Sequence, residues 1–217
     1  MTYMVGIAGG SGSGKGTIAA LIRVNLESFG LTAHVLCTDN CYKDLSDLNE
    51  DERKARCFDI DNNFDHPRAI DFARLLNLTS KLKRGEAFNY KTYNFLTQSY
   101  DDNSKKLNVR ATLDVAIVEG IYALYNGSDV GTKTNRELID LYDVSYFVTT
   151  SPVTATIRRI KRDIVERGCE VMDVLEQKEK TVNPMYNRFV FPTRIFADDT
   201  IRWDNNPTCD VDVLKKN

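Results

Sequence analysis

Gly9-Gly10-Ser11-Gly12-Ser13-Gly14-Lys15-Gly16-Thr17 is the stretch of the chain that decides the fold. An apolar run at residues 4–8 precedes it, and a helix-compatible run at residues 18–24 follows it. A strand, a glycine-rich loop, a lysine and a helix in this order form a phosphate cradle, because glycines let backbone N–H groups approach phosphate oxygens. Lys15 can then reach the β- and γ-phosphates of a nucleotide as a point charge. The stretch therefore predicts a nucleotide-binding α/β fold in which every residue of this loop lies against the phosphates.

One position of the loop departs from the usual pattern, in which Ser or Thr directly follows the lysine. Here Gly16 follows Lys15, and the hydroxyl falls on Thr17. A shift of one residue turns a side chain by about 100° around a helix. The phosphate prediction is unaffected, but two alternatives stay open for Mg²⁺: Thr17 ligates the ion, or water bridges the gap. A flexible Gly/Ser linker is disfavoured, because a linker would not lie between an apolar strand and a helix.

The overall composition fits a single α/β domain over residues 1–217. Its 29 basic and 31 acidic residues leave a net charge of −2, which gives no bulk attraction to nucleic acid or to an anionic membrane. No run approaches the roughly 18–20 apolar residues of a membrane span, and the N-terminus lacks the form of a signal peptide. Five cysteines without a Cys-x-x-Cys pair fit reduced thiols, so we expect a cytoplasmic protein. A zinc site at His34, Cys37 and Cys41 is disfavoured, because no second ligand pair completes it.

Apolar runs alternate with helical patterns along the chain, which predicts a mostly parallel sheet flanked by helices. The expected strands are residues 3–8, 33–38, 114–118, 144–149 and 199–203. The expected helices are residues 15–28, 68–83 and 153–167, and a fourth that begins near Cys169 and is ended or kinked by Pro184. In the third of these, Val153, Ile157, Ile160 and Ile164 form a stripe typical of a core-facing side.

Two segments do not fit this alternation. Residues 44–63 are highly charged and are expected to cover or border a site. Residues 86–113 indicate a β-hairpin inserted before residues 114–118, which are taken as the central strand. Tyr93 and Phe95 are two apart and so are expected on one face of a hairpin strand. They either stack on a planar ligand or pack the hairpin onto the domain.

Acidic side chains follow two of the predicted strands at the edge where ligands of open α/β sheets bind. Glu119 ends an apolar strand, where a carboxylate can hold Mg²⁺ or orient an acceptor. Asp39 follows the second strand, and it can accept a proton from an attacking hydroxyl. An Asx turn after the strand explains Asp39 equally well.

Residues 158–167 contain five basic and two acidic side chains. They form either the solvated face of a helix or a lid whose guanidinium groups neutralise a transferring phosphoryl group. The excess of one charge sign favours the lid, which is expected to span residues 153–183.

Several separated segments, in the same order, resemble the uridine-cytidine kinase family of the phosphoribulokinase/uridine kinase group. The resemblance covers residues 4 to about 204 and includes Thr38-Asp39-Asn40-Cys41-Tyr42, Asn63-Phe64-Asp65-His66-Pro67, Tyr93-Asn94-Phe95, Val118-Glu119-Gly120-Ile121 and Glu166-Arg167-Gly168. It implies a P-loop kinase fold with a five-stranded sheet, an inserted β-hairpin and an arginine-rich helical lid. It also implies a homo-oligomer, often a tetramer in the family.

The resemblance implies an ATP- and Mg²⁺-dependent kinase that phosphorylates the 5′-hydroxyl of a ribonucleoside, most simply uridine or cytidine in pyrimidine salvage. Asp39 would be the base, with Lys15, Arg159, Arg162 and Arg167 as the other catalytic residues. Mg²⁺ would be held by Thr17 and Glu119. The implied substrate contacts are Tyr42, Phe64, Asp65, Tyr93, Phe95, Gln98, Arg159 and Gln177.

Two positions depart from the family pattern, both on the nucleoside side. Gln98 replaces a base-reading histidine, and an amide can donate and accept like a neutral imidazole but with a different reach. Cys169 replaces a substrate-contacting arginine, and a thiol cannot replace a guanidinium. One alternative is therefore a related kinase with another small-molecule alcohol as acceptor. Another is a nucleotide-binding regulator with little catalysis, which is disfavoured because Asp39 and Glu119 are both present.

Overall fold

The computed structural model describes residues 1–59, 61–127 and 134–204. Five parallel strands form its main sheet, in the order β2 (Ala33–Cys37), β5 (Val115–Glu119), β1 (Tyr3–Gly9), β6 (Val144–Thr149) and β7 (Asp199–Arg202). The predicted strands and the parallel α/β class are confirmed. The prediction that residues 114–118 are the central strand is wrong, because β1 is third and β5 only second in the order of the five strands. Both β1 and β5 are continuous apolar runs, and that pattern identifies an inner strand without giving its position.

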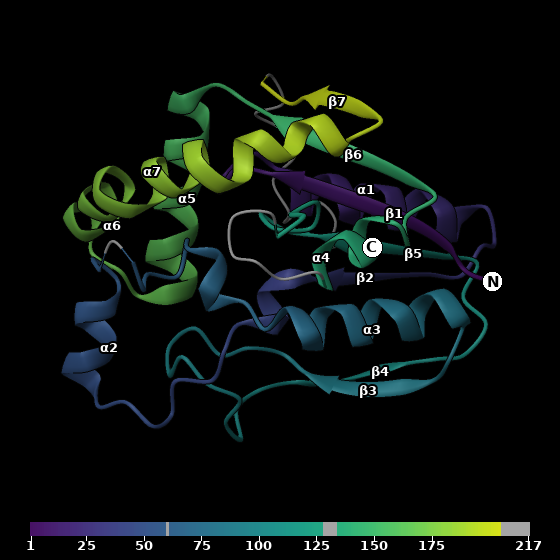
Figure 1. Cartoon of the computed structure of the whole chain (residues 1–217), viewed down its shortest axis with the longest axis horizontal. Coiled ribbons are helices and arrows are strands. Elements are labelled where there is room, and N and C mark those ends of the chain that lie inside the picture. The colour runs from purple at the N-terminus through teal and green to yellow at the C-terminus, as the bar shows by residue number, and fades with distance from the viewer. Residues whose placement is uncertain (60, 128–133, 205–217) are drawn as a thin grey trace.

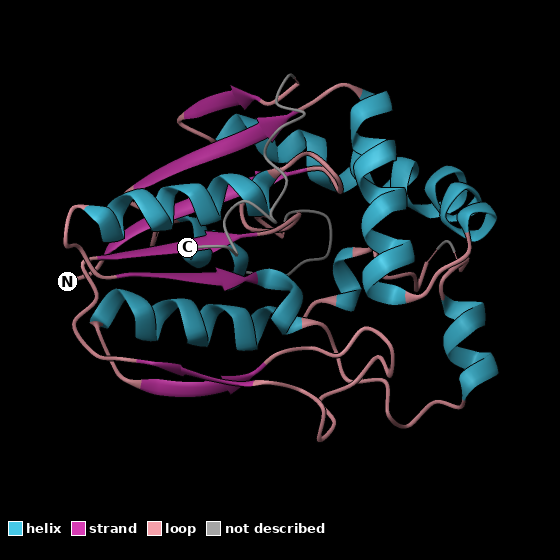
Figure 2. Cartoon of the chain, turned by 180° about the vertical axis from the view of Figure 1, so that it is seen from behind, coloured by secondary structure: helices cyan, strands magenta, loops and turns pink. Residues whose placement is uncertain are grey.

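Helices cover both faces of this sheet (Figures 1 and 2). On one face α1 (Lys15–Ser28) packs Ile18 and Ala19 against Ile7 and Ile117. On the other face α3 (Phe72–Arg84) contributes leucines to the larger core, and α4 (Thr134–Ile139) contacts α3. Burying each leucine side chain stabilises the fold by roughly 1.5–3 kcal/mol. The sheet is therefore a rigid support for the loops at its carboxyl edge.

The helix predicted over residues 68–83 begins later than its pattern suggests. His66 Nδ1 accepts a hydrogen bond from Arg68 N at 3.1 Å and starts a short 3₁₀ turn at Pro67–Ala69. The side chain of Asp71 then accepts from Arg74 N at 2.9 Å, which caps α3. His66 thus helps to start the turn, and Asp71 starts the α-helix.

The inserted hairpin is present as a separate antiparallel pair, β3 (Phe88–Lys91) and β4 (Lys106–Val109), which runs beside α3 (Figure 1). The expectation that Tyr93 and Phe95 share a strand face is wrong, because both lie beyond the end of β3. Asn94 turns the chain there: its Oδ1 atom accepts from Leu96 N at 3.0 Å. Its backbone also bridges to Ser99.

Helix α5 (Pro152–Arg167) buries charged side chains and exposes apolar ones, which is the reverse of the prediction. Val153, Ile157 and Ile164 are 69%, 61% and 39% exposed, whereas Arg159 and Asp163 are 5% and 1% exposed. Three of the four side chains of the predicted apolar stripe therefore do not face the core, and Ile160 is half-buried. Charged side chains take the buried face because each finds ionic partners there, as described below.

The chain stays helical after α5, through α6 (Val171–Gln177) and α7 (Asn183–Met185). Pro184 does not end the helical segment, because π-helical turns at Lys178–Val182 and Tyr186–Val190 continue it on both sides of α7. Within the described residues, none of the helices is long and apolar enough to cross a membrane.

The cysteines are free thiols at Cys37, Cys41, Cys57 and Cys169, and Cys209 lies outside the described residues. His34 Nε2 is 3.1 Å from Tyr90 Oη, so this strand histidine has a side-chain partner. The described part of the chain contains no metal-binding group of three His, Cys, Asp or Glu side chains.

Leu36 provides a test of the core on the α3 face, because its side chain is fully buried. We expect Leu36→Ala to lower the free energy of unfolding by about 2–5 kcal/mol, since it removes buried methyl groups and leaves a cavity. The same change at Leu96, which is 70% exposed, should cost no more than about 0.5 kcal/mol. Urea unfolding of both variants measures the difference, and equal losses would contradict the described core.

Candidate active site

The glycine-rich loop lies between β1 and α1 and is closed on two sides by other elements. A Cβ atom on Gly12 would lie 2.2 Å from Ala155 O, and one on Gly14 would lie 2.6 Å from Trp203 Cδ1. Both glycines also have positive φ angles, 77° and 95°. Lys15 begins α1, and its Nζ donates to Gly10 O at 3.4 Å. The positive end of the helix and this ammonium group therefore face the same loop, as an anion site requires.

Glu119 lies beside the start of α1, at the end of β5. Its side chain is buried, and burial raises the pKa of this carboxyl group, with Asp39 adding to the rise and Lys15 opposing it. A Cβ atom on Gly16 would lie 3.6 Å from Glu119 Oε1. Of the described residues, Gly16 and not Thr17 lines the cavity next to this carboxylate. Thr17 as a metal ligand stays a prediction, and the alternative with bridging water fits this opening.

The donor set around Glu119 fits Mg²⁺ and not a metal held by protein alone. Within the described ranges no cluster of three suitable side chains is present. Mg²⁺ typically keeps several waters and takes one or two carboxylates plus phosphate oxygens. A buried carboxylate beside a phosphate cradle meets that requirement.

Asp39 lies in a 3₁₀ turn, Thr38–Cys41, directly after β2. The backbone closes this turn, because Tyr42 N donates to Asp39 O at 3.5 Å. The carboxylate of Asp39 instead faces the lid, with Oδ2 3.8 Å from Arg167 Nη2. The end of β5 is close by, since a Cβ on Gly120 would overlap Thr38 Oγ1 at 1.6 Å. The structure thus brings Asp39 and Glu119 to the same edge of the sheet.

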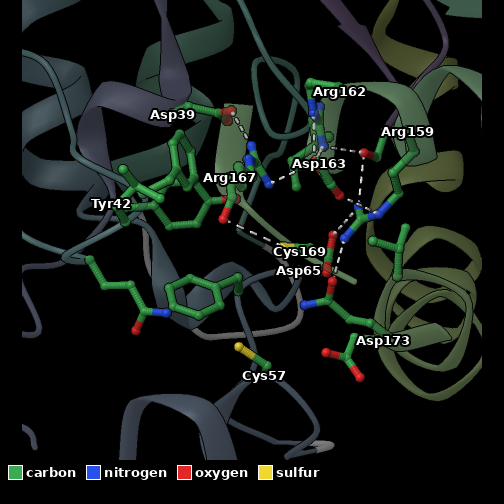
Figure 3. A pocket seen from close by; sticks show the side chains of 18 of the residues that line it. Asp39, Tyr42, Cys57, Asp65, Arg159, Arg162, Asp163, Arg167, Cys169 and Asp173 are labelled. Atoms are coloured by element: carbon green, nitrogen blue, oxygen red, sulfur yellow. Dashed lines mark hydrogen bonds and ion pairs between the residues drawn. The ribbon is translucent and has the colours of Figure 1, made fainter. Parts of the chain in front are cut away.

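A cavity of about 370 Å³ extends from the loop toward the lid and the hairpin (Figure 3). It brings together most of the residues predicted from the sequence. Those that line it are Ser11, Lys15, Asp39, Tyr42, Phe64, Asp65, Phe95, Gln98, Arg159, Arg162, Arg167 and Gln177. Tyr93 lines a neighbouring cavity together with Glu119, and its side chain is only 5% exposed.

Aromatic rings form one wall of this cavity. Tyr42 makes edge contacts with Phe64 and Phe95, at ring-centroid distances of 5.9 and 5.7 Å. The guanidinium carbon of Arg167 lies 3.9 Å from the centre of the Phe95 ring. Tyr93 packs behind these rings, 5.4 Å from Tyr42, so its ring supports the wall. The wall is apolar, its rings meet edge to face, and a guanidinium group lies over one of them.

Two buried acceptor atoms in the cavity lining have no hydrogen-bond partner among the described residues: Asp65 Oδ2 and Gln98 Oε1. Leaving such an atom unpaired costs about 1–3 kcal/mol. Asp65 is held in place by its backbone, because Tyr122 Oη donates to Asp65 O and Asp65 N donates to Asn63 Oδ1. The cavity therefore offers fixed acceptors to a ligand with hydroxyl or N–H donors.

The buried face of α5 supplies the positive charge of the cavity. Arg159 donates to Ser11 Oγ at 2.9 Å and to Gln177 Oε1 at 2.7 Å. Arg162 Nη2 lies 3.5 Å from the same Ser11 oxygen. Figure 3 shows both guanidinium groups beside Asp163, which the sequence reasoning left without a role. The only signal for it was an acidic residue within a basic run.

The segment at residues 44–63 borders the cavity, as expected. It contains α2 (Glu50–Arg56), which begins with a capping box between Asn49 and Glu52. Lys54, Cys57 and Phe58 line the cavity from this side. Cys57 was not predicted, and neither was Asp173 of α6, which lies at the same end (Figure 3).

A model of the Phosphoribulokinase / Uridine kinase family matches residues 4–209 of this chain. The uridine kinase of Staphylococcus aureus (strain JH9) is 35% identical over 213 residues, which cover 98% of this chain and 93% of that protein. The uridine kinase of Staphylococcus aureus (strain Newman) matches to the same extent.

Solved structures show the same fold at lower identity. A putative fructose transport system kinase from Silicibacter sp. TM1040 aligns with a TM-score of 0.70 and 22% identity, over 92% of this chain and 89% of that one. Phosphoribulokinase from Rhodobacter spheroides aligns with a TM-score of 0.66 and 17% identity, over 94% of this chain and 70% of that one. A possible uridine kinase from Bacillus stearothermophilus aligns with a TM-score of 0.59 and 15% identity, over 92% of this chain and 88% of that one.

The raised pKa of Glu119 predicts that this carboxylate destabilises the metal-free protein near neutral pH. A group whose pKa is higher in the folded state stabilises the fold only at low pH, where it is protonated in both states, and this contribution is lost as the pH rises. We therefore expect Glu119→Gln to raise the free energy of unfolding at neutral pH. The gain should shrink as the pH falls from the raised pKa of Glu119 toward the ordinary glutamate value of 4.5, and it should be absent below that value.

Urea unfolding in the presence of a metal chelator measures this effect. Glu27→Gln is the control, because Glu27 and Arg23 form an exposed pair worth at most about 1 kcal/mol. A Glu119→Gln variant that is less stable than the wild type at neutral pH would contradict a raised pKa for Glu119.

Proposed function

Because this chain belongs to the phosphoribulokinase/uridine kinase family and is a phosphotransferase with an alcohol acceptor, we propose that it phosphorylates the 5′-hydroxyl of a ribonucleoside. ATP is the proposed donor, and uridine and cytidine are the proposed acceptors. The observation that carries the proposal is one cavity, which is lined by Lys15 of the loop, by Asp39 and by the buried acceptor Asp65. A cytoplasmic location and a homo-oligomer remain predictions from the sequence.

In this proposal the loop and Glu119 bind the phosphates of ATP and the Mg²⁺ ion. Backbone N–H groups of the loop and the Lys15 ammonium would bind the β- and γ-phosphates. Glu119 would hold Mg²⁺ with the help of water in the opening at Gly16. When bound, Mg²⁺ neutralises charge that develops on the phosphate oxygens.

The acceptor hydroxyl is positioned and deprotonated by Asp39 in this proposal. Its carboxylate shares the cavity with Lys15 and lies 3.8 Å from Arg167. Phosphoryl transfer depends on in-line positioning of the hydroxyl, and a carboxylate in the same cavity as the donor loop can orient that hydroxyl and take its proton. Arg159 and Arg162 of α5 lie against Ser11 of the loop, where they can neutralise the transferring group and exclude water.

The acceptor pocket suits a ribose attached to a planar base. Asp65 Oδ2 can accept hydrogen bonds from the ribose hydroxyls, which would satisfy a buried atom that lacks a partner among the described residues. Tyr42, Phe64 and Phe95 provide apolar surface for the base. Gln98 and Gln177 supply amides that can donate to or accept from its edge.

A different alcohol is the second candidate acceptor, because the outer end of the pocket departs from the family pattern. Cys169, Cys57 and Asp173 line that end. Burial raises the pKa of the Cys57 thiol to about 11 and also raises the pKa of Cys169, so both thiols are neutral there. Two neutral thiols and a carboxylate favour a neutral or donor-rich acceptor over an anionic one.

An ADP-release assay over a panel of alcohols tests the proposal. We expect turnover with uridine and cytidine, and a KM for 2′-deoxyuridine that is higher by roughly tenfold or more, because one donor to Asp65 is missing. The panel also contains small neutral alcohols and sugar phosphates. Turnover with one of these and with no pyrimidine nucleoside would decide for the second candidate. ATP binding without any product would indicate a regulator.

Asp39→Asn tests the proposed base. The amide keeps the shape of the side chain but cannot take the proton, so kcat should fall by roughly 10²–10⁴. Asp47→Asn is the matched control, because Asp47 is exposed in the segment that follows the same turn, and its kcat should stay near that of the wild type. Steady-state kinetics with the best acceptor compares the two, and near-wild-type turnover of Asp39→Asn would remove Asp39 from this role.

A further inference from the structure

The three arginines that line the cavity from α5 converge on one buried carboxylate. We propose that Asp163 is a positioning residue, which holds Arg159, Arg162 and Arg167 at the spacing that phosphoryl transfer requires. Asp163 lines the cavity, but in this proposal it acts through these arginines. The inference rests on the proposed function, since it concerns the arginines of that same site.

The contacts of Asp163 are close and use both of its oxygen atoms. Arg162 Nε and Nη2 each lie 2.8 Å from Oδ1, and Arg167 Nη1 lies 3.5 Å from the same oxygen. Arg159 Nε lies 3.2 Å from Oδ2. The carboxylate is 1% exposed and Arg159 is 5% exposed, so this is a buried ionic cluster.

Helix geometry explains why one carboxylate can serve three guanidinium groups. Arg159 and Arg167 are four residues before and after Asp163, which places all three on one face of α5. Without the carboxylate, three like charges would lie on neighbouring positions and repel one another. With it, the cluster keeps a formal charge of +2 for an anionic ligand.

Each arginine also makes a second contact in a different part of the site. Arg159 Nη1 lies 3.7 Å from Asp65 Oδ1, and Arg167 Nη2 lies 3.8 Å from Asp39 Oδ2. The nearest contacts of the arginines with Asp163, at 2.8 to 3.5 Å, are shorter than these. When an acceptor claims Asp39 and Asp65, the arginines therefore keep Asp163 as their partner and stay in place.

Stability alone is a weak explanation for such a cluster. Buried ion pairs often contribute little net stability, because desolvation of the charges offsets their attraction, and apolar replacements can be neutral or better. The apolar side chains of the same helix are exposed instead, with Val153 at 69% and Ile157 at 61%. The helix thus buries charge at the expense of apolar contact, which is expected where the charges serve a ligand.

A double-mutant cycle tests the proposal with Asp163→Asn, Arg162→Gln and the variant that carries both. If Asp163 acts through the arginines, Asp163→Asn should lower kcat by roughly 10- to 100-fold with a smaller change in the nucleoside KM. The double variant should lose clearly less than the product of the two single losses, since Asp163 then acts only through Arg159 and Arg167. If Asp163 only stabilises the fold, its effect should be the same in both backgrounds. A kcat within about twofold of the wild type, or losses that multiply, would overturn the proposal.

Binding of a non-hydrolysable ATP analogue with Mg²⁺, measured by calorimetry, gives a readout that needs no acceptor. Asp163→Asn should weaken this binding by about tenfold, since misplaced guanidinium groups no longer meet the phosphates. If the wild type binds the analogue but phosphorylates no nucleoside, the proposed function fails while the role of Asp163 is still decided by binding. Unchanged affinity together with unchanged kcat would remove that role.

Asp143→Asn is the control for a purely structural loss. Asp143 accepts from Lys83 Nζ and Met4 N, both at 2.7 Å, and ties α3 to β1 away from the cavity. This variant should lower the thermal midpoint and leave kcat within about twofold of the wild type. If Asp163→Asn does not fold, Asp163→Glu replaces it, because it keeps the charge and moves it by one methylene group. A loss of kcat with an unchanged thermal midpoint then supports the proposal, and an unchanged kcat overturns it.

Discussion

The parallel pairing of β1 with its two neighbours is the constraint on which the site depends. In this register Ile7 and Cys37 both lie opposite Glu119, and Gly9 lies opposite Val148. The carboxyl ends of four strands therefore meet at one edge, where the phosphate loop, the Asp39 turn and Glu119 become neighbours. A parallel sheet has all its strand ends at the same side, so this convergence follows from the backbone before any side chain is considered.

The lid satisfies a different physical requirement, the pairing of buried charge. Arg159 and Asp163 are almost fully buried, and the described contacts give each an ionic partner. Burial of an unpaired ion is too costly to persist, so the arginines, Asp163, Asp39 and Asp65 hold one another in place. The same pairing fixes how α5 lies against the loop, and it explains why the apolar side chains of this helix remain at the surface.

Much of the candidate site could be predicted from residues that carry local signals. The loop at Gly9–Thr17 has a pattern that only a phosphate cradle explains well, and Asp39 and Glu119 follow strands whose apolar runs are unmistakable. Asp163 and Asp173 carry no such signal, because an acidic residue on a helix is usually a solvated one. Their place at the cavity depends on which side of α5 and of α6 faces the cavity. For α5, the spacing of the apolar residues predicted that the opposite side would be buried.

The amino-acid sequence by itself determined the fold class, the strand positions and the chemical groups at the strand ends, because strand and loop patterns are local and short. Tertiary structure alone decided which strand is central and that Tyr93 and Phe95 lie in a turn. It also decided which face of α5 is buried, and that Gly16 lines the cavity beside Glu119 while Thr17 does not. These features depend on contacts between residues far apart in the chain. A local pattern contains no information about which of two possible faces will meet a buried partner.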